Sequence, residues 1–259
     1  LSRFSGLWAG FKLISDTVET AASIYGDPGR VVVKLPENAD DYVPHTSIRW
    51  PDAPLDQERR LHDFKIPAAL AFARVNPLNK TIIRPAKGAM KLGIVATGKA
   101  YIDALQALSQ LGLNLEGAKA QGIGLYKVGL VWPLEKEGLC TFAKGAQELL
   151  ILEEKQSLVE TQIKEALYHL NADERPRITG KTDEKGKPLL PETYELSALQ
   201  ISQAISQRME VCKISLSVGQ KKEMSALQKR FKSSVGAIPL VHRSPFYCSG
   251  CPHNTSAKA

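Results

Sequence analysis

The sequence has little of what secreted or membrane proteins need. Its 259 residues contain no run near the roughly 18 apolar residues of a membrane helix, and no signal-cleavage pattern follows the N-terminus. Cysteine is scarce: Cys140 and Cys212 stand alone in apolar-periodic segments, and only Cys248 and Cys251 form a C-x-x-C pair. The absence of a secretory signal favours a reducing compartment. We therefore expect a cytoplasmic protein without a membrane segment.

Phosphate-binding fingerprints are also missing. Neither G-x-G-x-x-G nor the P-loop pattern occurs, so a dinucleotide fold or a P-loop NTPase is not indicated.

Positive charge is unevenly distributed. The net charge is +7, and six basic residues between positions 213 and 236 oppose the single acid Glu223. A solvated linker or helix face, an acidic protein partner and nucleic acid are all compatible with such a run. We favour the solvated linker or helix face and expect no nucleic-acid partner. The six residues are Lys213, Lys221, Lys222, Lys229, Arg230 and Lys232.

The middle of the chain has the clearest pattern, in which apolar strands alternate with helices. Such an order indicates right-handed crossovers and a mostly parallel sheet, so the fold class is α/β, a three-layer sandwich. The strands are expected at 92–97, 123–128 and 148–153, and the helices at 99–111, 134–145 and 158–170. A short edge strand is expected within 176–181, and Ser197 is placed to N-cap a further helix.

The first 90 residues have a weaker pattern. Helical spacing predicts a helix over 11–24, and Arg30 to Leu35 reads as a short strand. After a proline-bearing connection, helical spacing returns over 57–75, where Pro67 is expected to kink or break the helix.

Three short segments fall at the carboxyl ends of the expected strands, where open α/β sheets bind ligands. Thr97-Gly98 opens a helix whose N–H groups could hold an anion, although a single glycine at such a turn is commonly simple geometry. Glu153 or Glu154 is expected to be partly buried and paired, with a catalytic carboxylate as the alternative. The segments are Thr97-Gly98-Lys99, Lys127 to Gly129 and Glu153-Glu154-Lys155.

The C-x-x-C pair is the sharpest chemical motif. Cys248 and Cys251, with Ser249-Gly250 between them, could direct two thiolates at one metal or cluster. Pro252 separates the pair from His253, so the motif is not a c-type haem site, and no second pair completes a zinc site. A zinc ion with His253 as third ligand, and two unligated thiols, remain alternatives.

Several segments, in order, resemble the fused indolepyruvate:ferredoxin oxidoreductases, a branch of the 2-oxoacid:ferredoxin oxidoreductase family. They are SRFSGLWAGFKLISDTVETAASI, SIRWPDAPLDQERRLHDFKIPAALAFAR, KLGIVATGKAYIDALQAL, IGLYKVGLVWPLEKEGL, ELLILEEKQSLVETQIKEALY and RSPFYCSGCPHNTSAK. The resemblance implies oxidative decarboxylation of an aryl or related 2-oxo acid to an acyl-CoA, with electrons passing to ferredoxin. It also implies thiamine diphosphate, Mg²⁺ and a [4Fe–4S] cluster, with Cys248 and Cys251 as two cluster ligands.

The same resemblance implies a division of the chain. Residues 91–211 would form a transketolase C-terminal-like domain, also called domain II of pyruvate:ferredoxin oxidoreductase. Residues 1–35 would end a pyrimidine-binding domain, 36–90 would be a linker with a helix, 212–243 a basic linker, and 244–259 the start of a diphosphate-binding domain.

The resemblance also has gaps. The G-D-G motif that carries the cofactor's Mg²⁺ is absent, and Gly26-Asp27-Pro28 does not replace it. We therefore expect an internal segment of a larger, homo-oligomeric enzyme, without catalytic residues of its own. The rival interpretation is a non-catalytic α/β scaffold or protein-interaction module.

Overall fold

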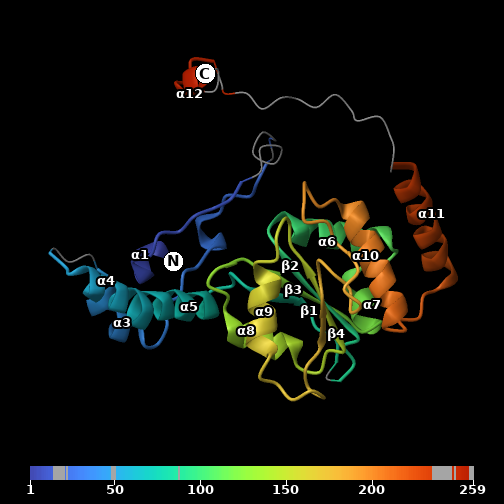
Figure 1. Ribbon diagram of the computed structural model, residues 1–259, viewed down its shortest axis with the longest axis horizontal. Helices are drawn as coiled ribbons and strands as arrows, with labels where there is room; N and C mark the ends of the chain where they lie inside the picture. The colour runs from blue at the N-terminus through green and yellow to red at the C-terminus, as the bar shows by residue number, and fades with distance from the viewer. Residues whose placement is uncertain are drawn as a thin grey trace.

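A mostly parallel sheet forms the centre of the protein (Figure 1). The computed structural model describes residues 1–13, 21, 23–47, 51–86, 88–234, 247 and 249–256. Within them the sheet has the strand order β1-β3-β2-β4-β5, in which β1 is antiparallel to β3 and every other neighbouring pair is parallel. The strands are β1 (Lys80–Ile83), β2 (Leu92–Thr97), β3 (Ile123–Val128), β4 (Glu148–Leu152) and β5 (Arg177–Thr179).

The three central strands lie where the apolar pattern predicts them. Successive side chains of a strand point to opposite faces, and both faces here are covered by helices. Ile94 and Ala96 of β2 therefore join one apolar core, while Val95 between them joins the other. The α/β class with a mostly parallel sheet is confirmed.

Helices cover the two faces as two separate layers (Figure 1). Ala104 of α6 and Ile205 of α10 belong to the first core, and Phe142 of α8 and Ile163 of α9 belong to the second. The first layer contains α6 (Lys99–Gln110), α7 (Leu115–Ala120) and α10 (Ala198–Val211). The second contains α8 (Lys136–Ala143) and α9 (Val159–Leu167).

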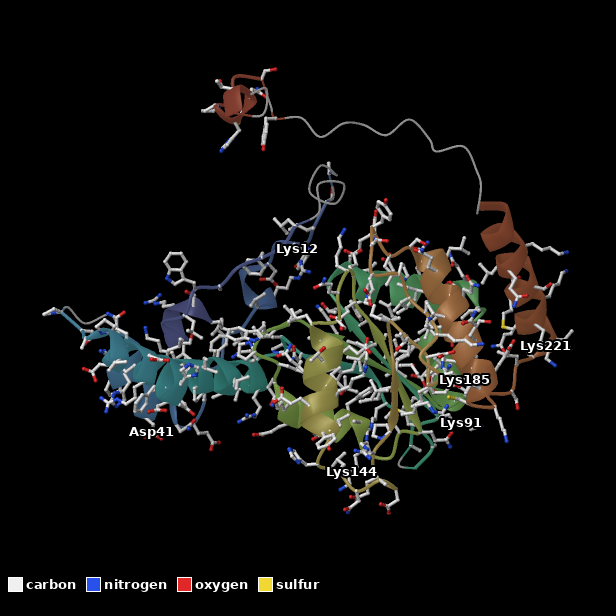
Figure 2. The ribbon with its side chains drawn as sticks, in the orientation of Figure 1. Lys12, Asp41, Lys91, Lys144, Lys185 and Lys221 are labelled. Carbon is white, nitrogen blue, oxygen red and sulfur yellow. The ribbon has the colours of Figure 1, made fainter. Side chains whose placement is uncertain are left out.

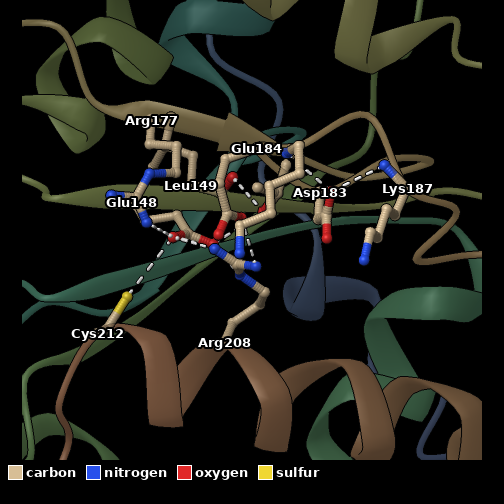
Figure 3. Close-up of polar contacts among 10 residues, drawn as sticks. Glu148, Leu149, Arg177, Asp183, Glu184, Lys187, Arg208 and Cys212 are labelled. Atoms are coloured by element: carbon tan, nitrogen blue, oxygen red, sulfur yellow. Dashed lines mark hydrogen bonds and ion pairs between the residues drawn. The ribbon is translucent and has the colours of Figure 1, made fainter.

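A buried ion pair ties the start of β4 to its neighbours (Figure 3). Glu148 has no exposed surface, and Arg208 of α10 binds both its oxygens, at 2.5 Å through Nε and 2.8 Å through Nη2. Arg177 donates to Oε2 at 3.1 Å and the Thr179 hydroxyl to Oε1 at 2.9 Å, both from β5. The thiol of Cys212, just beyond α10, lies 3.7 Å from Oε2. The carboxylate therefore links β4, β5 and α10.

The N-terminal helices form a small cluster beside the sheet (Figure 1). A π-helical turn, η2, joins α4 to α5, and the N–H of Ile66 bonds the carbonyl of Leu61 five residues earlier. Pro67 follows directly and cannot donate a backbone hydrogen bond, so the predicted irregularity falls at this point. The elements are α1 (Ser2–Ser5), η1 (Pro28–Arg30), α3 (Ala39–Thr46), α4 (Pro54–Arg60), η2 (Leu61–Lys65) and α5 (Ile66–Val75).

Two expectations for the N-terminal region are not met as stated. The strand expected at 30–35 is wrong: Val31 to Val33 are exposed, and this stretch pairs with no strand of the described chain. The side chain of Asn76 anchors the backbone at Lys34: its oxygen accepts from the Lys34 N–H at 3.0 Å and its nitrogen donates to the Lys34 carbonyl at 2.9 Å. The expected helix over 11–24 falls largely outside the described residues, and 11–13 and 23–27 are not helical.

Two elements lie where a linker was expected. Strand β1 extends the sheet inside the 36–90 segment, and α11 (Val218–Ser234) occupies most of the basic segment. The side chains of Met224 and Leu227 are three residues apart and buried against the first core. One apolar pair in a lysine-rich stretch gave too weak a period to predict this helix. The short helix α12 (His253–Ser256) follows the C-x-x-C pair.

Replacing Arg208 by alanine should destabilise the fold by about 3–5 kcal/mol, because the buried Glu148 charge would lose its main partner. Urea unfolding followed by circular dichroism measures this loss. Arg177→Ala is the matched control: that side chain is 45% exposed, so its removal should cost clearly less. Equal losses in the two variants would contradict the assignment of Arg208 as the principal partner.

Candidate functional site

The carboxyl ends of the central strands open into a cavity of about 750 Å³. The register of the strands aligns these ends, with Thr97 opposite Val128 and Ala96 opposite Leu152. All three carboxyl-end segments singled out in the sequence line it. Its charged lining residues are Lys12, Lys99, Lys127, Lys155, Glu153, Glu154 and Glu192.

The course of the chain explains why a cavity forms at this edge. After β2 the chain enters α6 on one face of the sheet, whereas after β3 and β4 it leads to α8 and α9 on the other. Connections that diverge to opposite faces leave a crevice between neighbouring strand ends, the usual ligand position in open α/β sheets. The fold therefore places the cavity at a topological switch point.

Gly98 makes the turn from β2 into α6. Its backbone has φ 56° and ψ −131°, a conformation that residues with a Cβ rarely adopt. No side chain caps the first turn of α6, whereas Asn114 caps α7 and Ser197 caps α10. The predicted capping role of Ser197 is confirmed, and the N–H groups of α6 start at the cavity wall.

Glu153 is structural. It is 4% exposed, and its carboxylate accepts hydrogen bonds from the N–H groups of Leu158, Val159 and Glu160 at 2.8–3.1 Å. This arrangement satisfies the first turn of α9, and the helix dipole stabilises the charge. Burial and pairing were predicted for this position or for Glu154, but the partner is a helix end.

Lys181 lies buried behind the cavity wall. Its ammonium donates to the carbonyls of Glu153 at 2.6 Å and Pro191 at 3.1 Å, and so joins the two loops that carry Glu154 and Glu192. Burial lowers the pKa of Lys181, although the surrounding carboxylates oppose that shift. No periodic pattern around Lys181 indicates its burial in advance.

The lysines of the cavity differ in their pairing. Lys99 forms ion pairs with Asp103 at 2.8 Å and Glu195 at 2.7 Å; burial acts to lower its pKa, but these hydrogen bonds outweigh burial and raise it. The Lys127 ammonium lies 5.3 Å from the centre of the Tyr101 ring. In the part of the chain that the structure describes, no ion pair involves Lys12, Lys127 or Lys155.

The C-x-x-C motif is only partly within the described residues. Cys248 lies outside them, while Cys251 is half-buried, with its sulfur 3.3 Å from Nδ1 of His253. Gly250 between the cysteines has φ 81°, which makes a tight turn. Across the described ranges, no group of three or more His, Cys, Asp or Glu side chains could hold a metal. The structure therefore leaves both predicted ligands as a hypothesis.

Two further motifs prove to be structural. Glu135, from the WPLE segment, is buried and accepts from the N–H groups of Glu137 and Gly138, capping α8. Arg74 at the end of α5 reaches the same carboxylate at 3.4 Å, which ties the N-terminal helices to the sheet. Asp27 accepts from the N–H of Gly29 at 2.8 Å, so its carboxylate stabilises a local turn.

The fold and its carboxyl-end cavity define an α/β domain of the kind that binds ligands beside a parallel sheet. A family model described as the indolepyruvate oxidoreductase domain matches residues 82–231. This match covers more than half of the chain and nearly all of the sheet with both helical layers. The chain belongs to the indolepyruvate oxidoreductase domain family.

Curated relatives agree with this family. The chain is 25% identical over 166 residues to indolepyruvate oxidoreductase subunit IorA of Pyrococcus horikoshii, and 27% identical over 166 residues to that of Thermococcus kodakarensis. Each match covers 64% of this chain but 22% of the relative. The chain thus spans about a fifth of the length of the curated relatives it matches.

Two solved structures are more distantly similar. One is a 2-oxoglutarate:ferredoxin oxidoreductase from Magnetococcus marinus, at 14% identity and TM-score 0.37, covering 76% of this chain and 30% of that one. The other is a split-gene transketolase in an inactive tetramer, at 18% identity and TM-score 0.36, covering 51% and 41%. These low scores carry no argument about function.

The thiols of Cys212 and Cys251 should differ in their reactivity toward alkylating reagents. Burial raises the pKa of Cys212 to about 11, and the negative charge of Glu148 adds to this effect, whereas Cys251 is half-buried. Iodoacetamide at about pH 8 should therefore modify Cys251 well before Cys212 in the folded chain. Mass spectrometry of the peptides over time measures both rates, and denaturant should make them similar. Equal rates without denaturant would contradict the buried position of Cys212.

Proposed function

We propose that this chain is part of a thiamine-diphosphate-dependent 2-oxoacid:ferredoxin oxidoreductase of the indolepyruvate type. The parent enzyme would convert an aryl or related 2-oxo acid to an acyl-CoA and pass electrons to ferredoxin. The family match over residues 82–231 is the observation that supports this most, because it coincides with the folded sheet unit. We expect the parent to be cytoplasmic and homo-oligomeric. No helix in the described ranges is long and apolar enough to cross a membrane.

The C-x-x-C pair fits the electron-transfer part of this proposal. Cys248 and Cys251 would supply two of the thiolates of a [4Fe–4S] cluster, since soft sulfur ligands suit iron–sulfur centres. The turn at Gly250 and the half-buried sulfur of Cys251 are compatible with a ligand position near solvent. The remaining ligands would come from other residues of the parent enzyme.

The described residues do not fit a thiamine diphosphate site. The sequence has no G-D-G motif, and Asp27 of the nearest approximation already accepts from a backbone N–H. The cofactor would stabilise the carbanion formed on decarboxylation, and its Mg²⁺ would be held by residues outside this chain. We assign no residue here to either group, and no catalytic role to this domain.

The domain would instead connect the cofactor-carrying parts of the enzyme. Residues 1–35 would end the pyrimidine-binding domain, the sheet unit would be the transketolase C-terminal-like domain, and 244–259 would begin the diphosphate-binding domain. The sheet unit starts with β1 at Lys80 rather than at 91 and includes α11 after 211. A non-catalytic scaffold remains the rival function.

The test uses the enzyme that carries this chain, purified without oxygen and supplied with thiamine diphosphate, Mg²⁺, CoA and indolepyruvate. Cys248→Ser and Cys251→Ser should each lower iron content, change or abolish the EPR signal of the reduced cluster, and slow ferredoxin reduction. The reason is that loss of one thiolate leaves the cluster under-coordinated.

Cys140→Ser is the matched control, because Cys140 is a half-buried thiol on α8 with no assigned metal. Its cluster signal and turnover should equal those of the unaltered enzyme. Full iron content and unchanged spectra in both C-x-x-C variants would remove the cluster assignment. Absence of any 2-oxoacid-dependent reduction by the unaltered enzyme would favour the scaffold.

A further inference from the structure

We infer that the cavity at the carboxyl edge of the sheet binds an organic phosphate, a small molecule with a phosphate group and a hydroxyl-bearing body. This is a second ligand site, separate from the thiamine diphosphate and cluster chemistry of the proposed function. Four observations carry it: the cavity, its place at the switch point, the lysines without carboxylate partners, and the glutamates that line the same cavity.

The cavity has the size and position of a ligand site. Small-molecule pockets commonly occupy about 300–1,000 Å³, so a volume of about 750 Å³ holds a metabolite of moderate size. The opening lies where the chain leaves β2 and β3 toward opposite faces of the sheet. Part of its wall comes from the ends of β2, β3 and β4, which the buried cores hold on both sides.

The positive charge that lines the cavity favours a ligand with an anionic group. Lys12, Lys127 and Lys155 contribute three ammonium groups that form no ion pair in the described chain. Figure 2 shows Lys12 on the N-terminal segment that runs beside the upper edge of the sheet unit. The uncapped first turn of α6 adds backbone N–H groups. A phosphate, with up to two charges and three oxygens, matches several cations better than a single carboxylate does.

The carboxylates that line the cavity favour hydrogen-bond donors on the rest of the ligand. Glu154 and Glu192 line the cavity, and Glu192 is exposed. One oxygen of Glu154 accepts from the N–H of Leu196 at 3.4 Å, whereas Glu153 is fully engaged at the start of α9. Carboxylates accept hydrogen bonds from hydroxyl groups, so the body of the ligand should carry donors. A sugar phosphate has this combination in one molecule.

The structure also shows how the two loops that carry Glu154 and Glu192 are held together. Lys181 bonds the carbonyls of Glu153 and Pro191, one residue before Glu154 and Glu192 respectively. A buried cation therefore holds in place the two loops that carry Glu154 and Glu192. Lys12, Lys127 and Lys155 line the same cavity and stay available for the ligand.

Isothermal titration calorimetry on the chain at low salt tests the inference with ribose 5-phosphate as the probe. Binding should be measurable, and added salt should weaken it because the contacts are ionic. The double variant Lys127→Ala/Lys155→Ala should bind at least about tenfold more weakly, since charge-assisted hydrogen bonds are lost. Lys144→Ala/Lys185→Ala, two exposed lysines away from the cavity, is the matched control and should bind as the unaltered chain does.

Two comparisons separate the ligand classes. Citrate should bind more weakly than ribose 5-phosphate, and equal or tighter binding would overturn the assignment to phosphate. Glu192→Ala should weaken ribose 5-phosphate but not inorganic phosphate, because only the sugar offers hydroxyl donors. No binding of ribose 5-phosphate, or equal binding by the two lysine double variants, would overturn the site. None of these readouts depends on thiamine diphosphate, iron or turnover.

Discussion

The buried carboxylate of Glu148 is the interaction on which the arrangement of the sheet unit depends. Both of its oxygens are occupied by donors, from Arg208 on α10 and from Arg177 and Thr179 on β5. A buried charge is tolerated only when its hydrogen bonds are complete, so the positions of these elements are coupled. The short edge strand β5 has only three residues and gains a side-chain anchor beyond its backbone pairing.

The carboxyl ends of the strands carry charged groups in a different arrangement from the amino ends. At the amino edge Glu148 is neutralised by fixed partners, whereas at the carboxyl edge the ionisable groups line an open cavity. Glu153 and Lys181 are intermediate between these two arrangements. They lie next to the open cavity, but each is buried and bonded mainly to backbone groups. One edge of the sheet is thus closed by ion pairing, and the other presents charge to solvent.

The sequence predicts the part of the fold that has strong periodicity. Strands β2, β3 and β4 were found because each is a buried apolar run, and the carboxyl-end segments followed from their parallel order. Strand β1 and helix α11 were missed because each offers few apolar residues to the core. Val31 to Val33 led to the prediction of a strand that does not form. Their β-branched side chains favour a strand, but no neighbouring strand is present to pair with them in the described chain.

The cavity could be predicted only in part. Thr97-Gly98, Lys127 and Glu153-Glu154 follow from strand ends, but Lys12 lies in a stretch that was expected to be helical, and Glu192 lies in a loop without regular periodicity. Tertiary packing alone brings those two residues to the same cavity. Similarly, the partner of Glu153 could not be read from spacing, because a helix N-terminus and a lysine satisfy a carboxylate equally well.

The π-helical turn at Leu61–Lys65 has a consequence for how the N-terminal helices face their surroundings. Each residue of an α-helix turns the chain by about 100°, so one residue accommodated as an extra in a wide turn rotates everything before it relative to everything after it. Helix α5 buries Ala68, Ala69, Ala71, Phe72 and Ala73, whereas the buried residue of α4 is Arg60. A single-residue deletion within the turn would therefore rotate the charged side chains of α4 by about 100° relative to the buried side of α5.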